Sequence, residues 1–315
     1  MLPVAEELAE TLFDLAVPHE DINELVQIGR RVTDDPELLR FLEASVDELV
    51  RGMGEIGTAV DLPELDWPSG DLQRCFPVFV FVAALPYTRA YHRARGVPDE
   101  VSRRTLADLG RNMVVHRRRY GKLGVQAPWW LTHHFRGELY QLGRLQFERA
   151  RLGERTARAV AAAGLDATAG TACLNLHIPD FFGPLSPAAC DRSLALAREF
   201  FARHYPEEKY RAGLCHSWLL DPQLRDYLPE YSNIVRFQDR FRLARADVEP
   251  SDSEPVQFVF GDPELAVENL PRRTAVERAV GDHLRAGGHW YIGHGWFPLQ
   301  SDPVRSGPTT FRGPR

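Results

Sequence analysis

Lysine is nearly missing from this sequence, since only Lys122 and Lys209 appear among 38 basic residues. The formal net charge is −6 at pH 7, so the chain as a whole does not attract a polyanion and we expect no nucleic-acid partner. The arginine run at 117–119 is either a local anion site or the end of a helix, where the helix dipole favours cations. The second interpretation is favoured.

Long apolar runs are also missing. The longest, residues 75–86 (CFPVFVFVAALP), is shorter than the roughly 20 residues that a membrane-spanning helix needs. It is predicted to be a buried core segment, and we expect no membrane partner. The chain starts with acidic rather than basic residues, at Glu6, Glu7 and Glu10, so no secretion signal is visible. A cytoplasmic location follows as an expectation.

The four cysteines show no C-x-x-C spacing, which argues against a zinc ribbon or a disulfide framework. From residue 173 onward the sequence also contains no G-x-G-x-x-G, Walker, G-x-S-x-G or H-E-x-x-H motif, so dinucleotide-binding, P-loop and zinc-protease functions lose support there. The nearest histidine clusters are His133-His134 with Glu138, and His289 with His294. Neither has the i, i+4 histidine pair of a helical metal site, and we expect no metal.

Periodic apolar residues and capping signals predict a helical domain over residues 1–130. Its expected helices are residues 6–15, a helix that starts at Asp21, one that starts at Asp35-Pro36, and one from Ser102 to about Tyr120.

From residue 131 to 303 the pattern predicts an α+β domain with a mixed sheet. Expected strands are residues 140–147, 173–179, 211–220, 233–243, 256–260 and 289–297. One helix is expected to begin at Ser186-Pro187, and another at Thr274, with Glu277 at the capping-box position and Gly287-Gly288 at its end. Residues 304–315 are predicted to be a disordered tail.

Several phrases resemble one family of proteins. They are NLHIP at 175–179, CHSWLLDPQL at 215–224 and SNIVRFQ at 232–238, with LPRRTAVERA at 270–279 and HWYIGHGWF at 289–297. With the order of elements, they are similar to bacterial acyltransferase-domain proteins that join a helical N-acyltransferase N-terminal domain to a GNAT-like C-terminal domain. The resemblance covers about residues 5–300. It implies transfer of an acyl group from acyl-CoA, acetyl-CoA or a carrier-protein thioester to a small-molecule amine.

The resemblance also implies a place for the donor. In GNAT-like proteins, acyl-CoA lies beside the fourth strand, and its pyrophosphate binds at the start of the next helix, where N–H groups are unpaired. Residues 256–260 are the expected strand, and Thr274 starts the expected helix. The usual R/Q-x-x-G-x-G/A loop is absent, so Arg272 and Arg273 are the candidate phosphate ligands in its place.

The run AGLCHSWLLD at 212–221 contains a Cys-His-Ser row. On a strand, neighbouring side chains point to opposite faces, so Cys215 and His216 do not form a nucleophile–base pair. Cys215 is more simply a buried core residue, and Asp221 is expected to cap the short helix that begins at Pro222. His177, at the end of a strand, is the first candidate for the general base, and His216 is the second.

Each histidine is alternatively a core residue that holds a loop. Asn233, Arg236 and Gln238 are candidate donors to a carbonyl, or residues of a solvated strand face. The leading hypothesis is an N-acyltransferase that works by direct attack, with a helical domain that closes over the substrate. A catalytically silent GNAT-like binding protein and, less favoured, a cysteine thioesterase are the alternatives.

Overall fold

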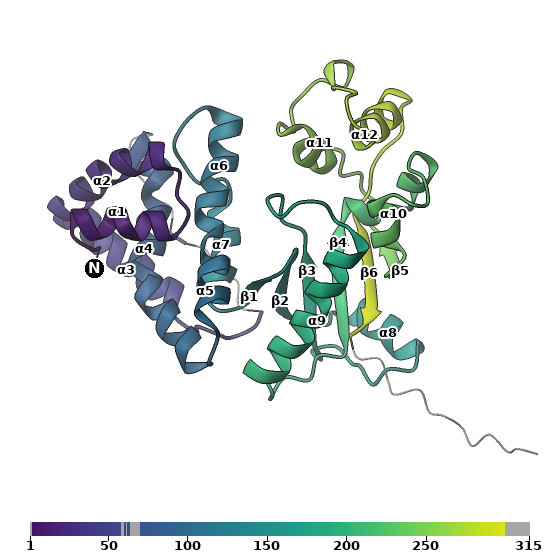
Figure 1. The fold of residues 1–315 in the computed structure, drawn as a ribbon, viewed down its shortest axis with the longest axis horizontal. Coiled ribbons are helices and arrows are strands. Elements are labelled where there is room, and N and C mark those ends of the chain that lie inside the picture. Colours follow the sequence, from purple (N-terminus) through teal and green to yellow (C-terminus); the bar gives the residue numbers. More distant parts are fainter. Residues whose placement is uncertain (1, 58–59, 61, 64–69, 300–315) are drawn as a thin grey trace, which may run out of the picture.

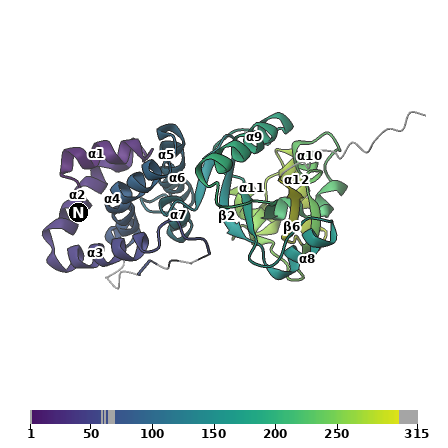
Figure 2. The ribbon, with the colours of Figure 1, turned by 90° about the horizontal axis from the view of Figure 1, so that it is seen from below.

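The computed structural model describes residues 2–57, 60, 62–63 and 70–299. The predicted tail, residues 304–315, lies outside the described residues. The chain forms a helical lobe and a sheet-containing lobe that lie side by side, and the helical lobe stands next to strands β1 and β2 (Figures 1 and 2). The predicted α+β class, with a helical N-terminal part followed by a mixed sheet, is confirmed.

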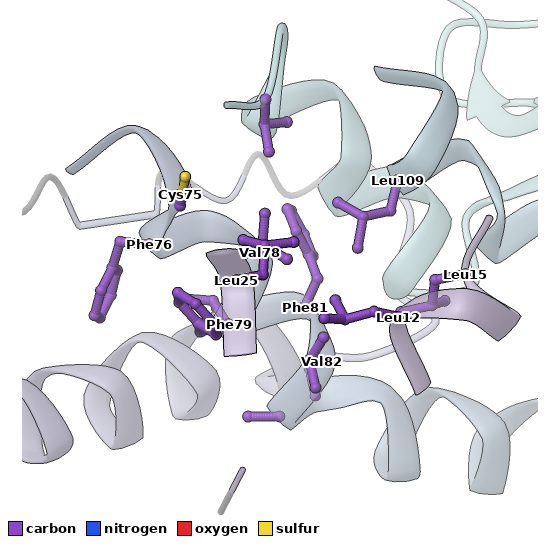
Figure 3. Close-up of a cluster of buried hydrophobic side chains, with 14 of the residues drawn as sticks. Leu12, Leu15, Leu25, Cys75, Phe76, Val78, Phe79, Phe81, Val82 and Leu109 are labelled. Atoms are coloured by element: carbon purple, nitrogen blue, oxygen red, sulfur yellow. The ribbon is translucent and has the colours of Figure 1, made fainter. Parts of the chain in front are cut away.

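The helical lobe is built around one long apolar helix, α4 (Asp71–Ala94). The run at 75–86 lies inside it, so the prediction of a buried core segment is confirmed. Figure 3 shows Phe79 and Phe81 of α4 in this core, with Leu12 of α1, Leu15 just after that helix and Leu109 of α6 around them. The other helices are α1 (Ala5–Asp14), α2 (His19–Asp34), α3 (Pro36–Val50), α5 (Asp99–Leu106), α6 (Asp108–Tyr120) and α7 (Pro128–Phe135).

The described part of the second lobe contains a six-stranded sheet in the order β1-β2-β3-β4-β6-β5. All neighbours are antiparallel except β3 and β4. Its strands are β1 (Leu139–Leu142), β2 (Leu145–Arg151), β3 (Ala172–His177), β4 (Ala212–Ser217), β5 (Arg242–Ala246) and β6 (Gly293–Pro298).

Two helices cover the two faces of this sheet (Figure 2). Helix α9 (Pro187–His204) packs its apolar side on Phe147, Leu176 and Cys215. Helix α8 (Glu154–Ala162) packs on the opposite face, against Cys173 and Trp296. The alternation of strand side chains assigns each residue to one of these faces. We call them the α9 face and the α8 face.

The segment between β4 and β6 forms a smaller helical unit around Trp290, which is fully buried. Because β6 runs antiparallel to β4, this unit lies at the end of the sheet where β4 terminates. Figure 1 shows α11 and α12 at that end. The unit comprises η1 (Trp218–Leu220), η2 (Pro222–Asp226), α10 (Asn233–Gln238), α11 (Ser253–Phe260), η3 (Val267–Asn269) and α12 (Ala275–Arg285).

Two predicted strands are wrong. Residues 233–238 form helix α10, whose N–H at Val235 is capped by the Ser232 hydroxyl. Residues 253–260 form helix α11, because Val256, Val259 and Phe260 bring an i, i+3, i+4 stripe onto the core around Trp290. Short apolar runs fit either a strand or a helix, and here the packing partner decides.

Three smaller predictions also need correction. Residues 140–147 do not form one strand but a hairpin, which turns at Gly143, where φ is +71°. Helix α2 begins at His19, so Asp21 lies in its first turn and is buried against Arg117. Ser102 lies inside α5, where it binds His92, and α5 and α6 are separate helices.

Four capping predictions are confirmed. The Asp35 carboxylate accepts from N–H groups at the start of α3, and the Ser186 hydroxyl accepts from Ala189 at the start of α9. Thr274 and Glu277 form a full capping box on α12. Asp221 caps η2 at Gln223 and also accepts from the Tyr291 N–H, so one carboxylate ties two segments together.

The two lobes join along the outer edge of the sheet, at β1. This edge strand is covered by α5, because the Gln141 N–H donates to the Thr105 hydroxyl at 3.0 Å, which leaves no open edge at that point. Two arginines that are almost fully buried lie at the joint. Arg136 donates to the carbonyls of Leu49, Arg51 and Gly52, and Arg149 donates to Gly54 and Gly137.

Candidate active site

The parallel pair β3–β4 is joined over only two register positions, Leu174 with Gly213 and Asn175 with Leu214. Beyond them each strand continues for two or three residues without pairing to the other. We call this place the ladder end. Carboxyl ends of neighbouring parallel strands are where α/β proteins commonly bind ligands.

His177 is the last residue of β3, two positions past Asn175, so its side chain lies on the α8 face. Its Nε2 lies 2.7 Å from Oε2 of Glu148 on β2. A carboxylate only accepts, so Nε2 carries the proton and the basic lone pair is on Nδ1. The side chain is 28% exposed. This arrangement of a histidine backed by a carboxylate suits a general base.

Glu148 is held ionised although it is largely buried. Burial alone would raise the pKa of its carboxyl, but the hydrogen bond and charge of His177, together with His133 and Asn175, bring the pKa below its ordinary value. Asn175 donates to the same oxygen that His177 binds, at 3.3 Å. The carboxylate is therefore ready to stabilise a proton that arrives on His177.

His216 occupies the matching position on β4, two residues past Leu214, on the same face and solvent-exposed. Its ring contacts that of His294, its cross-strand partner on β6, with centroids 4.5 Å apart. His294 in turn binds Asp247 at 2.9 Å. The structure thus brings both candidate bases to the ladder end, one on each of its strands.

Helix α7 of the helical lobe supplies residues that sequence reasoning missed. The Trp130 ring packs against His177 with centroids 4.6 Å apart and also contacts His133 and His134. These residues lie before the first strand and are not spaced like a known motif. The one signal in the sequence is the His133-His134/Glu138 cluster, which by spacing alone raises only the question of a metal site.

A second buried cluster lies beside this contact. His134 is fully buried, with Nε2 3.1 Å from Asp108 Oδ2, and Gln146 on β2 donates to the other oxygen of Asp108 at 3.2 Å. Arg111 also binds that oxygen at 2.8 Å. Although burial alone would raise it, the charges and hydrogen bonds of His134 and Arg111 hold the pKa of Asp108 far below its ordinary value. This cluster fixes α6 and α7 on β2.

The row that begins at Cys215 does not form a catalytic group. Cys215 is 2% exposed and packs in the apolar core under α9. Burial raises the pKa of its thiol to about 12, which removes the thiolate that a nucleophile requires. Ser217 caps η1 by accepting from the Leu219 N–H. The geometry therefore gives no support to a cysteine thioesterase.

The candidate phosphate ligands Arg272, Arg273 and Thr274 lie at the start of α12 and bind residues of that helix. Arg272 pairs with Asp282 and Arg273 with Glu277. The Thr274 N–H and the Glu277 N–H are taken up by the capping box. Since residues 253–260 are helical, α12 does not follow a strand in the way the resemblance implied.

The helix that does follow a strand of the parallel pair is α9, which comes after β3 and before β4. Arg240 lies at its first turn, where it donates to the Pro187 carbonyl at 3.1 Å and pairs with Asp191 at 2.6 Å. Its Nε is buried with no hydrogen-bond partner among the described residues. Arg144 lies at the same loop, where it donates to Pro179 and Gly183. A helix start with two guanidinium groups nearby fits a phosphate.

The residues expected as donors on a strand lie on helix α10 instead. Asn233 begins this helix and Arg236 is exposed on it. Gln238 ends it and donates to the Leu219 and Asp221 carbonyls. In the described ranges, no three His, Cys, Asp or Glu side chains are placed to hold a metal ion. None of the helices described there is long and apolar enough to cross a membrane.

A mixed sheet with one parallel pair whose ladder ends early, a histidine–carboxylate pair at that point and a helical domain against the edge strand define a GNAT-like class of transferase. Residues 6–137 match the N-acyltransferase N-terminal domain, and residues 139–297 match the GNAT-like C-terminal domain. The chain belongs to this family of N-acyltransferases, as the sequence resemblance predicted.

Solved acyltransferase structures are similar to this chain over most of its length. A crystal structure of an acyltransferase in complex with decanoyl-CoA and teicoplanin is 40% identical, with a TM-score of 0.85, and the match covers 95% of this chain and 90% of that chain. A complex with CoA and 10C-teicoplanin gives the same values, and a complex with decanoyl-CoA is 39% identical with the same TM-score and coverage. No curated protein sequence matches the chain.

Proposed function

We propose that this protein transfers a medium-chain acyl group from acyl-CoA to an amine of a glycopeptide-like small molecule, with His177 as general base. The observation that carries the proposal is the His177–Glu148 pair at the ladder end. Acyl-CoA as donor, expected from the sequence, is supported by the acyltransferases crystallised with decanoyl-CoA and CoA. The complexes with teicoplanin support the acceptor class. This acceptor is more specific than the small-molecule amine that the sequence resemblance implies.

The chemistry needs one proton acceptor and one breaking C–S bond. The acceptor nitrogen attacks the thioester carbonyl, the C–N bond forms and the C–S bond breaks. The sulfur leaves as a thiolate, which takes a proton from solvent to become the CoA thiol, and His177 later returns its proton to solvent. His177 Nδ1 takes the proton that the nitrogen loses, while Glu148 stabilises the imidazolium through Nε2. His216, on the other strand of the ladder end, is the second candidate for this proton.

For the donor, we infer that the pyrophosphate binds the start of α9, where Arg240 and Arg144 lie. The positive end of the helix dipole favours an anion there. Arg272, Arg273 and Thr274 are the alternative phosphate site, at the same end of the sheet.

Replacing Arg240 by Ala should raise KM for decanoyl-CoA about tenfold, since a charged hydrogen bond is lost. An equal effect of the double change Arg272→Ala and Arg273→Ala, with none at Arg240, would move the site to α12.

The test of the function is mass-spectrometric detection of acyl transfer from octanoyl- or decanoyl-CoA to a glycopeptide that carries a free amine. Conversion by the wild type and a loss of about 100-fold or more in kcat for His177→Ala are expected. Transfer only from an acylated carrier protein would replace CoA as donor. No turnover with any donor, despite binding of acyl-CoA, would favour the silent binding protein.

We also propose that the protein works in the cytoplasm. An acyl-CoA donor and four cysteines that are all free and buried support this placement. Fractionation of cells that express a tagged chain would test it, and recovery outside the cytoplasmic fraction would contradict it.

A further inference from the structure

His133 of the helical lobe lies between two carboxylates. Its Nδ1 is 2.8 Å from Oε2 of Glu138 and 3.9 Å from Oε1 of Glu148. The other oxygen of Glu148 binds His177. Glu138, His133, Glu148 and His177 therefore form one continuous series, which starts at the joint between the lobes and ends at the ladder end.

The charges around His133 favour its protonated form. Burial alone would lower the pKa of its imidazole, and Arg136 acts in the same direction. The hydrogen bond to Glu138 and the negative charges of Glu148 and Glu138 outweigh both, so the pKa of His133 lies above its ordinary value. A cation between two carboxylates balances one of the two buried negative charges, which burial would otherwise disfavour.

The far end of the series is rigid. Arg136 is 1% exposed and donates to Glu138 Oε1 at 2.6 Å, while its other nitrogens bind carbonyls at the end of α3. Trp130, one turn before His133 on α7, packs on the rings of both His133 and His177. The position of His133 relative to Glu148 is thus set by the way the helical lobe docks on the sheet.

We propose that His133 is a positioning residue for acyl transfer: its imidazolium holds Glu148 where this carboxylate accepts the His177 Nε2 proton. The helical lobe then completes the His177–Glu148 pair of the sheet lobe and is more than a cover over the substrate. This inference rests on the proposed role of His177 as base. His133 and Glu138 would then have a function that neither a sequence motif nor the GNAT-like fold indicates.

The experiment follows the titration of the His177 ring by nitrogen-15 NMR in the full-length protein, with the resonance assigned through His177→Gln. Glu148→Gln removes a negative neighbour, so the His177 midpoint should fall by about one pH unit. His133→Asn removes a positive charge next to Glu148, so the midpoint should rise by about half a unit to one unit. Shifts in opposite directions from Glu148→Gln and His133→Asn would show that the charges of this series act on His177. Residues that only pack against each other would not produce such a pair of shifts.

Glu138→Gln is the second variant, because it weakens the hydrogen bond that keeps His133 protonated and leaves Glu148 unchanged. It should shift the His177 midpoint in the same direction as His133→Asn, and it serves alone if that variant does not fold. His116→Asn is the matched control, since His116 is another mostly buried histidine of the helical lobe with one hydrogen bond, to the Lys122 carbonyl. It should leave the His177 midpoint in place.

Acyl transfer from decanoyl-CoA gives the second readout. We expect kcat of His133→Asn to fall about tenfold with little change in KM, because Glu148 is then held less firmly beside His177 while substrate binding is unchanged. A wild-type midpoint and wild-type kcat in both His133→Asn and Glu138→Gln would overturn the inference. If instead the midpoint shifts as expected but His177→Ala keeps full turnover, His133 still positions the pair, and it is the role of His177 as base that fails.

Discussion

The indole of Trp130, on a helix of the first lobe, packs edge-on against the imidazole of His177, on a strand of the second, with ring centroids 4.6 Å apart. The contact joins residues that are 47 positions apart. The indole lies against the imidazole and limits where that ring can move. The candidate active site is therefore built from both lobes.

Replacing Trp130 by Ala should impair both stability and turnover. The indole also contacts His133 and His134, so its loss leaves a gap at the joint, and we expect a cost of about 2–3 kcal/mol in the free energy of unfolding. Urea titration measures this. Trp129→Ala is the matched control, because that side chain is 64% exposed and should change stability by about 0.5 kcal/mol or less. Equal costs for the two variants would contradict the packing described.

Changing Cys215 to Ala should leave acyl transfer intact. The thiol faces the apolar core under α9, and burial raises its pKa to about 12. Iodoacetamide should therefore not modify it in the native protein at pH 8, but should do so in 6 M guanidinium chloride. Peptide mass spectrometry distinguishes the two states. Rapid native alkylation at Cys215 together with loss of activity would revive the thioesterase interpretation.

Stability should fall in acid partly through Asp108. Its folded-state pKa lies below its ordinary value, so its contribution is fully present above the unfolded pKa and is lost as pH falls toward the folded pKa. Between pH 7 and about pH 3, the stability difference between wild type and Asp108→Asn should therefore shrink. Urea unfolding at pH 7, 4 and 3 measures this difference. A difference that stays constant with pH would show that the charge of Asp108 does not stabilise the fold.

Arg149 should be one of the most sensitive positions at the joint. It is 2% exposed, pairs with Glu208, donates to Gly54 and Gly137, and lies over the Tyr205 ring at 4.0 Å. Replacing it by Met removes the cation that pairs with Glu208, which keeps the Tyr210 hydroxyl as a donor, and takes one donor from each of the Gly54 and Gly137 carbonyls. We expect a cost of about 3–5 kcal/mol.

The control for Arg149→Met is Arg151→Met on the same strand. Arg151 is exposed and makes one hydrogen bond, to the Gly170 carbonyl. Its loss should change the unfolding free energy by about 1 kcal/mol or less. Thermal melts of the two variants, run side by side, compare them directly, and similar melting temperatures would contradict the role assigned to Arg149.

Much of the architecture could be predicted from local sequence. The caps at Asp35, Ser186 and Thr274 are correct because capping depends on residues that are three or four positions apart. His177 could be chosen because it ends an apolar strand before a proline and a turn. The phrases at 175–179 and 215–224 were specific enough to predict the family.

Other features depended on contacts between distant parts of the chain. Residues 233–238 and 253–260 have apolar runs that suit a strand, and only packing around Trp290 and η1 makes them helical. Reading 256–260 as a strand makes α12 the expected place for a phosphate, whereas the structure puts α9 after a strand of the parallel pair. The start of α9 had its cap predicted, but nothing local indicated that Arg240 would lie beside it.

The sequence by itself determined the family, the order of the two lobes, the starts of α1, α3, α9 and α12, and the histidine at the end of β3. The tertiary structure alone decided what stands around that histidine. Glu148 reaches it across the β2–β3 ladder, and Trp130 and His133 reach it from another lobe. Caps and periodicity act between near neighbours in the chain, whereas the orientation and charge of a base are set by groups that only folding brings within a few ångströms.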